Sequence, residues 1–291
     1  MKEKKVNNIA VKPVLNNEIS YTKKNLKSFK IIPQLYYNMF ICAKKKSGKT
    51  SLLNTLIEEG TNKGTTIWLF CATYEVDASW RTIIKNLKKK GYVVNAFSSI
   101  KEGKVNILDN AIEQLQQPVE EEEPKPKKGK KSQPPAPKPI FSLFPVEEDD
   151  EPEENIIVDE IEMKVAKKKK VKKQVPHHLF IFDDISTELR NPSVAKLLKV
   201  HRHLKASCII SSQYLHDLQP ASILQLDYFV AFKSFSLEKL EYIHKMLDLS
   251  LTFEKFWEIY KTATNDKYNF LFMNVRTEEA RRNLDNIIDY S

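Results

Sequence analysis

The chain has 291 residues, of which 41% are hydrophobic, so it can bury the core of one large or two small domains. This composition excludes a wholly disordered or fibrous chain. Residues 118–176 hold 13 lysines and 14 acidic residues and are nearly neutral, whereas the rest of the chain carries 34 Lys and Arg against 24 acidic residues. A basic body favours a polyanionic partner such as nucleic acid, although lysine-rich surfaces also occur without one.

No apolar run approaches the roughly 18 to 20 residues that span a bilayer, and the first residues lack the apolar core of a signal peptide. We therefore expect an intracellular, soluble protein with no integral membrane segment. Cys42, Cys71 and Cys208 each lie in a strand-like apolar run without the spacing of a zinc site. They are predicted to be small buried side chains in a reducing compartment.

From residue 34 onward, apolar runs that predict strands alternate with amphipathic segments that predict helices. This alternation is typical of βαβ units and a mostly parallel sheet. In chain order the expected elements are a strand at 34–43, a helix through 52–57, a strand at 65–73, a helix at 79–90 and a strand at 92–97.

The alternation stops at residues 118–176, which contain 10 of the 14 prolines and long runs of like charge. This segment is too polar to bury a core, so we expect a disordered insertion within one domain. The predicted organisation is a basic N-terminal extension (1–30), the first part of an α/β domain (31–117), the insertion (118–176) and the second part of the same domain (177–291).

The alternation resumes after the insertion with an apolar strand at 177–186. Asn191 and Pro192 are predicted to be the N-cap and the first residue of a helix. The later expected elements are strands at 207–213, 227–232 and 268–275 and helices near 216–224, 237–247 and 253–260. The sequence thus predicts six or seven strands in one α/β domain.

The segment from Ala43 to Thr50, AKKKSGKT, lies between a predicted strand and a predicted helix. This is the setting of a P-loop, in which backbone N–H groups and a lysine meet the phosphates of a nucleotide and a hydroxyl meets Mg²⁺. Ala43 stands where the pattern has its first glycine, and a lysine-rich turn that matches by chance is the alternative. The residues predicted to bind ATP are Ala43, Lys44, Lys45, Lys46, Ser47, Gly48, Lys49, Thr50 and Ser51.

A second motif, LFIFDD, is an apolar strand that ends in Asp183 and Asp184. The carboxyl ends of such strands point into the ligand crevice of an open α/β sheet. We expect Asp183 to join Thr50 as a ligand of Mg²⁺ and Asp184 to activate the attacking water, with Glu188 as a fallback for that role. The two motifs together form a Walker A and Walker B pair.

Gln213 ends the next predicted strand, 30 residues after Asp183. A neutral amide at this position can hydrogen-bond both a γ-phosphate and the attacking water, so Gln213 is a candidate sensor. A polar residue that merely leaves a strand is the equally simple alternative.

These motifs, AKKKSGKTSLL, HLFIFDDIS and RHLKASCIISSQ, resemble those of the genome-packaging ATPases of the FtsK–HerA superfamily, particularly the poxvirus-type branch. The resemblance covers about residues 30–117 and 177–275. It implies a P-loop NTPase fold with the sensor strand between the two Walker strands, and an oligomeric ring of identical subunits that moves double-stranded DNA into a capsid. It also implies viral capsid proteins as partners, and a location in the host cytoplasm (viral factory), the virion or the nucleus.

Such motors use an arginine of the neighbouring subunit to stabilise the transition state. We expect Arg202 to supply this finger, with Arg190 as the alternative, while a solvated helix arginine is the simpler interpretation of Arg202. Diffuse lysines such as Lys85–Lys90 are candidates for contacts with DNA phosphates. Three other functions stay open: a P-loop nucleoside or nucleotide kinase, a relative that moves plasmid or chromosomal DNA, and a non-catalytic nucleotide-binding scaffold.

Overall fold

The computed structural model describes residues 25–117, 173–233 and 235–290. Nearly all of the expected N-terminal extension and insertion, residues 1–24 and 118–172, lies outside the described residues. The described parts that come before and after the insertion form one compact unit.

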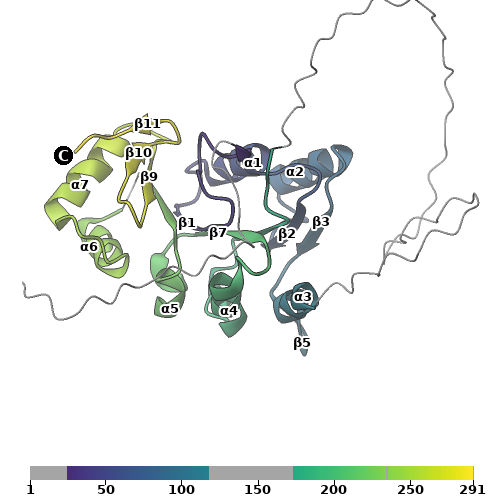
Figure 1. Ribbon diagram of the computed structural model, residues 1–291. Coiled ribbons are helices and arrows are strands. Elements are labelled where there is room, and N and C mark those ends of the chain that lie inside the picture. Colours follow the sequence, from purple (N-terminus) through teal and green to yellow (C-terminus); the bar gives the residue numbers. More distant parts are fainter. Residues whose placement is uncertain (1–24, 118–172, 234, 291) are drawn as a thin grey trace, which may run out of the picture. The chain divides into compact units, whose positions relative to one another are not determined.

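A nine-stranded sheet forms the centre of this unit, in the order β11-β10-β9-β8-β1-β7-β6-β2-β3 (Figure 1). Its strands are β1 (Asn38–Cys42), β2 (Thr66–Cys71), β3 (Val94–Phe97), β6 (His178–Asp183), β7 (Ala206–Ser212), β8 (Tyr228–Phe232), β9 (Phe270–Asn274), β10 (Ala280–Arg282) and β11 (Asn286–Ile287). The six strands from β8 to β3 in this order are parallel, and β9, β10 and β11 add an antiparallel edge. The predicted mostly parallel sheet is confirmed, as is the position of the candidate sensor strand β7 between β1 and β6.

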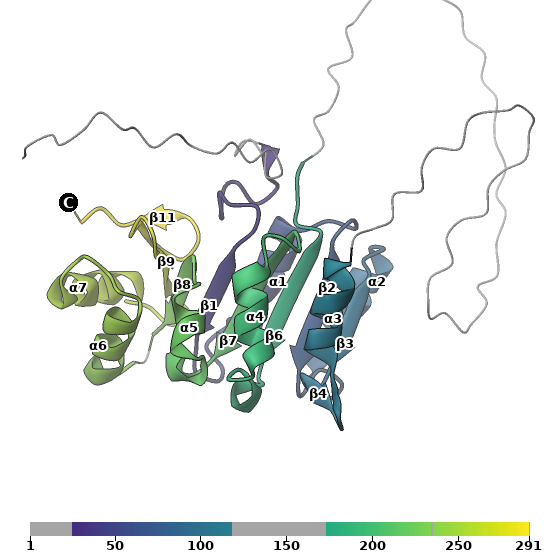
Figure 2. The same cartoon turned by 60° about the horizontal axis from the view of Figure 1, so that its bottom comes forward.

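Helices cover both faces of the sheet, with α1 and α2 on one face and α3, α4 and α5 on the other (Figure 2). The helices are α1 (Lys49–Gly60), α2 (Ala78–Lys89), α3 (Ile107–Gln116), α4 (Pro192–Val200), α5 (Pro220–Ile223), α6 (Leu237–Met246) and α7 (Phe253–Ala263). None of the helices in the described part of the chain is long and apolar enough to cross a bilayer.

Strand β6 shows why the sheet is buried on both faces. Phe180 and Phe182 pack into the core under α3, α4 and α5, whereas Leu179 and Ile181 pack into the core under α1 and α2. Successive strand side chains point to opposite faces, so a strand covered by helices on both sides must be apolar throughout. The sequence displays this as the continuous run LFIF.

The expected helix start at Asn191 and Pro192 is confirmed: the Asn191 side chain accepts a hydrogen bond from the Ser193 N–H, and Pro192 lies in the first turn. Helix α3, the small hairpin β4 (Lys101–Glu102) and β5 (Val105–Asn106), and the edge strands β10 and β11 were not predicted. Each of these strands has two or three residues, too few for periodicity to reveal.

The first described residues after each gap, near Leu26 and near Gln174, pack on the rest of the domain. Leu26 is buried and forms a β-bridge with Gln174, and the Lys27 ammonium donates to the carbonyl of Thr61 at 2.6 Å. The described ends of the predicted extension and insertion are therefore paired with each other.

Candidate active site

The predicted phosphate loop connects β1 to α1. Ala43 is buried and its N–H donates to the Ser212 carbonyl of β7 at 3.0 Å, while Lys44, Lys45 and Lys46 are exposed. Gly48 precedes α1 with a φ of 98°, a left-handed conformation that glycine adopts without strain. The loop therefore directs the first N–H groups of a three-turn helix, together with several ammonium groups, toward one small region.

Lys49 and Asp183 meet at the carboxyl end of the sheet. The Lys49 Nζ lies 2.8 Å from the Asp183 Oδ1, although the two residues lie on either side of the insertion in the sequence. Strand β7 separates β1 from β6, so Lys49 reaches across the end of β7 to the last residue of β6. The structure thus brings together the lysine of the first motif and the acid of the second.

Trp80 is a part of this site that its own motif does not reveal. It lies in the first turn of α2, is buried, and its indole N–H donates to the Asp183 Oδ2 at 2.9 Å. Both carboxylate oxygens of Asp183 are therefore held, one by Lys49 and one by Trp80. No local pattern signals this contact, because it joins the helix after β2 to the end of β6.

Two further polar atoms near the loop have no protein partner. The hydroxyl oxygens of Ser47 and Ser211 are buried and make no hydrogen bond within the described residues. Ser211 pairs in register with Asp183, so both hydroxyls lie at the edge of the sheet that carries the loop. Buried hydroxyls without partners are costly, so these two atoms suit a site that a polar ligand completes.

The Thr50 hydroxyl and the Asp183 carboxylate, the predicted Mg²⁺ ligands, are hard oxygen donors of the kind that Mg²⁺ prefers. Among residues 25–117, 173–233 and 235–290, no three His, Cys, Asp or Glu side chains gather into a metal-binding group. Mg²⁺ is commonly held by one or two protein ligands together with phosphate oxygens and waters, so this sparse donor set fits a metal that arrives with a nucleotide.

Asp184 directly follows β6 and is exposed, with a φ of 56°. The carboxylate of Glu188 instead accepts hydrogen bonds from the Ser99 hydroxyl at 2.8 Å and from the Ile100 N–H at 2.7 Å. Glu188 therefore fixes the loop after β3, and Asp184 is the better placed of the two to meet a water.

Gln213 follows the last residue of β7, next to the start of the phosphate loop. Its neighbour Ser212 pairs in register with Cys42, and Gln213 lines a largely apolar cavity of about 430 Å³ together with Cys42 and Lys239. The buried thiol of Cys42 contacts the Gln213 carbonyl, and burial raises its pKa to about 12. Gln213 therefore lies beside the loop, and its role as a sensor stays a prediction.

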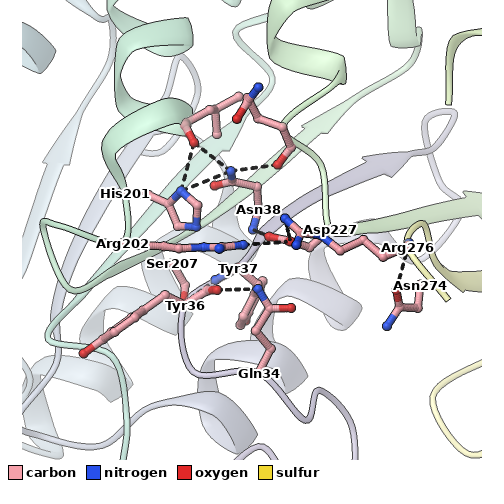
Figure 3. A network of polar contacts seen from close by, with 12 residues as sticks. Gln34, Tyr36, Tyr37, Asn38, His201, Arg202, Ser207, Asp227, Asn274 and Arg276 are labelled. Atoms are coloured by element: carbon pink, nitrogen blue, oxygen red, sulfur yellow. Dashed lines mark hydrogen bonds and ion pairs between the residues drawn. The ribbon is translucent and has the colours of Figure 1, made fainter. Parts of the chain in front are cut away.

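Arg202 does not join this site within the chain. It precedes β7, at the end of the sheet where the parallel strands begin, opposite the phosphate loop. There its guanidinium lies 3.3 Å from the buried Asp227 carboxylate (Figure 3). Arg276 binds the same carboxylate oxygen at 3.1 Å, and the Asn38 N–H donates to the other oxygen. A role for Arg202 as a finger therefore depends on a second subunit and stays a prediction.

The neighbouring His201 is buried and its Nδ1 contacts the Leu198 carbonyl at 2.9 Å. Burial lowers the pKa of this imidazole. Arg190, the alternative finger, lies in the segment between β6 and α4, on the side of the sheet where β6 ends and the phosphate loop lies. Its guanidinium donates to the His216 carbonyl at 2.6 Å.

Three features define a P-loop NTPase that has an additional strand between its two Walker strands. They are a phosphate loop after β1, an acid at the end of β6 that pairs with the lysine of that loop, and a polar residue directly after the intervening strand β7. The family of the poxvirus A32 protein matches residues 146–282. This match confirms the resemblance to the poxvirus-type packaging ATPases. It includes Asp183 and Gln213 but not the phosphate loop. No curated protein gives a significant match.

Solved structures of similar fold include the genome packaging NTPase B204 from Sulfolobus turreted icosahedral virus 2. Its complex with AMP is 13% identical and has a TM-score of 0.50, with 87% of this chain and 98% of that chain covered. Its complex with ATP-gammaS is 15% identical with a TM-score of 0.46 and the same coverage. B204 from Sulfolobus turreted icosahedral virus is 16% identical with a TM-score of 0.48, covering 84% and 96%. At these identities the likeness describes a shared fold.

Proposed function

We propose that this chain is an ATP-hydrolysing motor that moves double-stranded viral DNA into a capsid during virion assembly. The ion pair between Lys49 and Asp183 carries the proposal, because it assembles the two halves of an ATP site from distant parts of the sequence. The match to the poxvirus A32 family and the fold shared with a genome packaging NTPase support the same conclusion.

The residues divide the chemistry as follows. The loop N–H groups and Lys49 bind the phosphates of ATP, and Thr50 and Asp183 hold Mg²⁺, which neutralises phosphate charge when bound. Asp184 accepts a proton from the attacking water, and Gln213 orients that water from the end of β7. Trp80 is a positioning residue, since its N–H fixes the Asp183 carboxylate.

Helix α2 offers a surface for the DNA backbone. Arg81, Lys85, Lys88 and Lys89 are exposed on this helix and line one shallow depression with Tyr74. Contacts to phosphates position a duplex without reading its sequence, as a packaging motor requires. We further propose that the motor is a ring of identical subunits in which Arg202 of one subunit reaches the site of the next, and that it docks on capsid proteins in the viral factory of the host cytoplasm.

The central experiment measures ATP hydrolysis by the full chain with and without duplex DNA, alongside particle mass by light scattering. We expect Mg²⁺-dependent turnover that duplex DNA stimulates, in particles larger than a monomer, and no turnover in Lys49→Ala. A Lys245→Ala variant is the matched control, because this lysine is exposed on α6 away from the loop. Unchanged turnover in Lys49→Ala would remove the ATP site.

The same assay separates the other candidate functions. Transfer of phosphate from ATP to a nucleoside, without a response to DNA, would identify a kinase. Tight ATP binding without hydrolysis, unchanged in Asp184→Asn, would identify a scaffold. DNA-stimulated hydrolysis by a protein that associates with plasmids and not with capsids would identify a relative that moves other DNA.

The DNA surface has its own test. The double variant Lys85→Glu/Lys88→Glu should lose most DNA stimulation and flatten the salt dependence of DNA binding, because it removes phosphate contacts. Its hydrolysis without DNA should persist. Lys199→Glu/Lys245→Glu makes the same charge change on α4 and α6 and should leave stimulation intact. Equal loss in both variants would show only an effect of net charge.

A further inference from the structure

A second cavity adjoins the phosphate loop and has no role in the chemistry described above. It has a volume of about 670 Å³ and begins at Gly48, the last loop residue before α1. Its walls come from the exposed side of α1 and from segments near β9 and β10, and they include Ser51, Leu52, Thr55, Tyr268, Leu284 and Asp285. A volume of a few hundred cubic ångströms suits a small organic ligand.

Tyr268 separates this cavity from the cationic one around the loop. The cationic cavity is lined by Lys44, Lys45 and Lys46, and Tyr268 lines both it and the cavity along α1. A Cβ atom on Gly48 would lie 3.7 Å from the Tyr268 Cδ1, so the ring is in close reach of the loop. A ligand with one anionic end and one flat apolar end would therefore extend from the lysines past this ring.

Tyr268 is also unusual in its own conformation. Its side chain is 56% exposed and its φ is 71°, in the left-handed region that bulky residues rarely adopt. Such strain costs free energy, and an exposed ring recovers little of it through burial. The Lys267 ammonium lies 4.9 Å from the ring centroid, which adds positive charge beside the aromatic face. The folded chain holds an aromatic surface in the open, next to the site of the phosphates.

We propose that Tyr268 is the residue on which the adenine base of ATP stacks, and that the cavity along α1 holds the base and ribose. The two cavities share Tyr268 and Phe232 in their linings, which points to a single occupant of both, because the base of a nucleotide must lie within one ribose of its phosphates. Leu52 and Leu284 supply apolar walls, and the Asp285 carboxylate at the rim accepts a hydrogen bond from the amino group of adenine. This inference rests on the proposed ATP site and adds its base-binding half.

The test compares ATP with tripolyphosphate, which carries the phosphates but no base. Affinities are measured by titration calorimetry on the full chain. The wild-type protein should bind ATP more tightly than tripolyphosphate. Tyr268→Ala should weaken ATP binding about tenfold, the size expected for the loss of one base–aromatic stack. Its affinity for tripolyphosphate should change by less than about twofold.

Three further variants complete the test. Tyr268→Trp keeps an aromatic face and should keep ATP affinity within about twofold. Thr55→Trp fills the cavity from an exposed position on α1, so it should reproduce the selective loss of ATP affinity even if Tyr268→Ala folds poorly. Phe29→Ala removes an exposed aromatic ring from the segment before β1, which contacts the far end of α1, and should change neither affinity.

Failure of the base site and failure of the proposed ATP site give different results in these titrations. Equal loss of ATP and tripolyphosphate affinity in Tyr268→Ala, or no loss of either, would overturn the base site while leaving the phosphate site in place. Equal wild-type affinities for the two ligands would do the same. A wild-type protein that binds neither ligand would overturn the proposed function, and this inference with it.

Discussion

The ion pair between Lys49 and Asp183 can be tested by a double-mutant cycle on the nucleotide-free protein. At 2.8 Å and an effective dielectric constant of about 20, two unit charges attract by about 6 kcal/mol. Desolvation of the buried carboxylate offsets roughly half of this, so we expect a net coupling of about 3 kcal/mol. Lys49→Met leaves Asp183 charged and buried with only the Trp80 N–H, so it should lower the free energy of unfolding by about that amount.

Asp183→Asn should cost less, because the neutral amide still accepts from Trp80 and leaves no buried charge. The double variant should be close to Asp183→Asn alone. For a domain of this size, 3 kcal/mol corresponds to a fall in melting temperature of about 6 to 12 °C, which calorimetry resolves. Losses that add within about 0.5 kcal/mol would refute the reasoning, since independent sites are additive.

Three other perturbations follow from particular contacts. Trp80→Phe removes the N–H that holds the Walker B carboxylate, so we expect a loss of about 1 to 2 kcal/mol in unfolding free energy and slower ATP turnover, whereas Trp257→Phe on α7 should change turnover little. Burial, and to a smaller extent the neighbouring His177, lowers the pKa of His178 from 6.5 to about 4. As the pH falls from 6.5 toward 4 the unfolded imidazole takes up a proton that the folded one does not, so stability decreases, and His178→Gln should reduce that decrease in melting curves at pH 7 and pH 5. Gly48→Ala forces a side chain into a left-handed φ of 98° and should lower both stability, by about 1 kcal/mol, and ATP affinity. Gly60→Ala, at the end of α1 without such a φ, is its control, and equal effects of the two changes would argue against a strained loop.

Much of the fold could be predicted from short stretches of sequence. The continuous apolar run of β6 reports burial on both faces, and Asn191 with Pro192 marks the start of α4. These signals are local, because a strand or a helix cap depends on residues within a few positions of each other. The edge strands β10 and β11 were not predicted because each has only two or three residues, too few to show an alternating pattern.

The candidate site likewise contains some residues that the sequence identifies and others that only the structure reveals. Lys49 and Asp183 were identified from their own motifs, and the structure adds that they are in contact. The contribution of Trp80 was missed, since an indole hydrogen bond to a residue 103 positions away leaves no periodic trace. Tyr268 was likewise unremarked, because its exposure and its left-handed φ are properties of the folded turn before β9.

By itself, the sequence determined the elements of an α/β domain and the residues of a phosphate loop, because both are encoded by neighbours along the chain. Only the tertiary structure decided which distant residues share the edge of the sheet at which strands β1, β6 and β7 end. It places Trp80 in contact with Asp183 and Tyr268 beside Gly48. It also pairs Arg202 with Asp227 at the opposite end of the sheet, where the parallel strands begin. The order of strands in a sheet decides such contacts, and that order depends on packing between segments that the sequence keeps far apart.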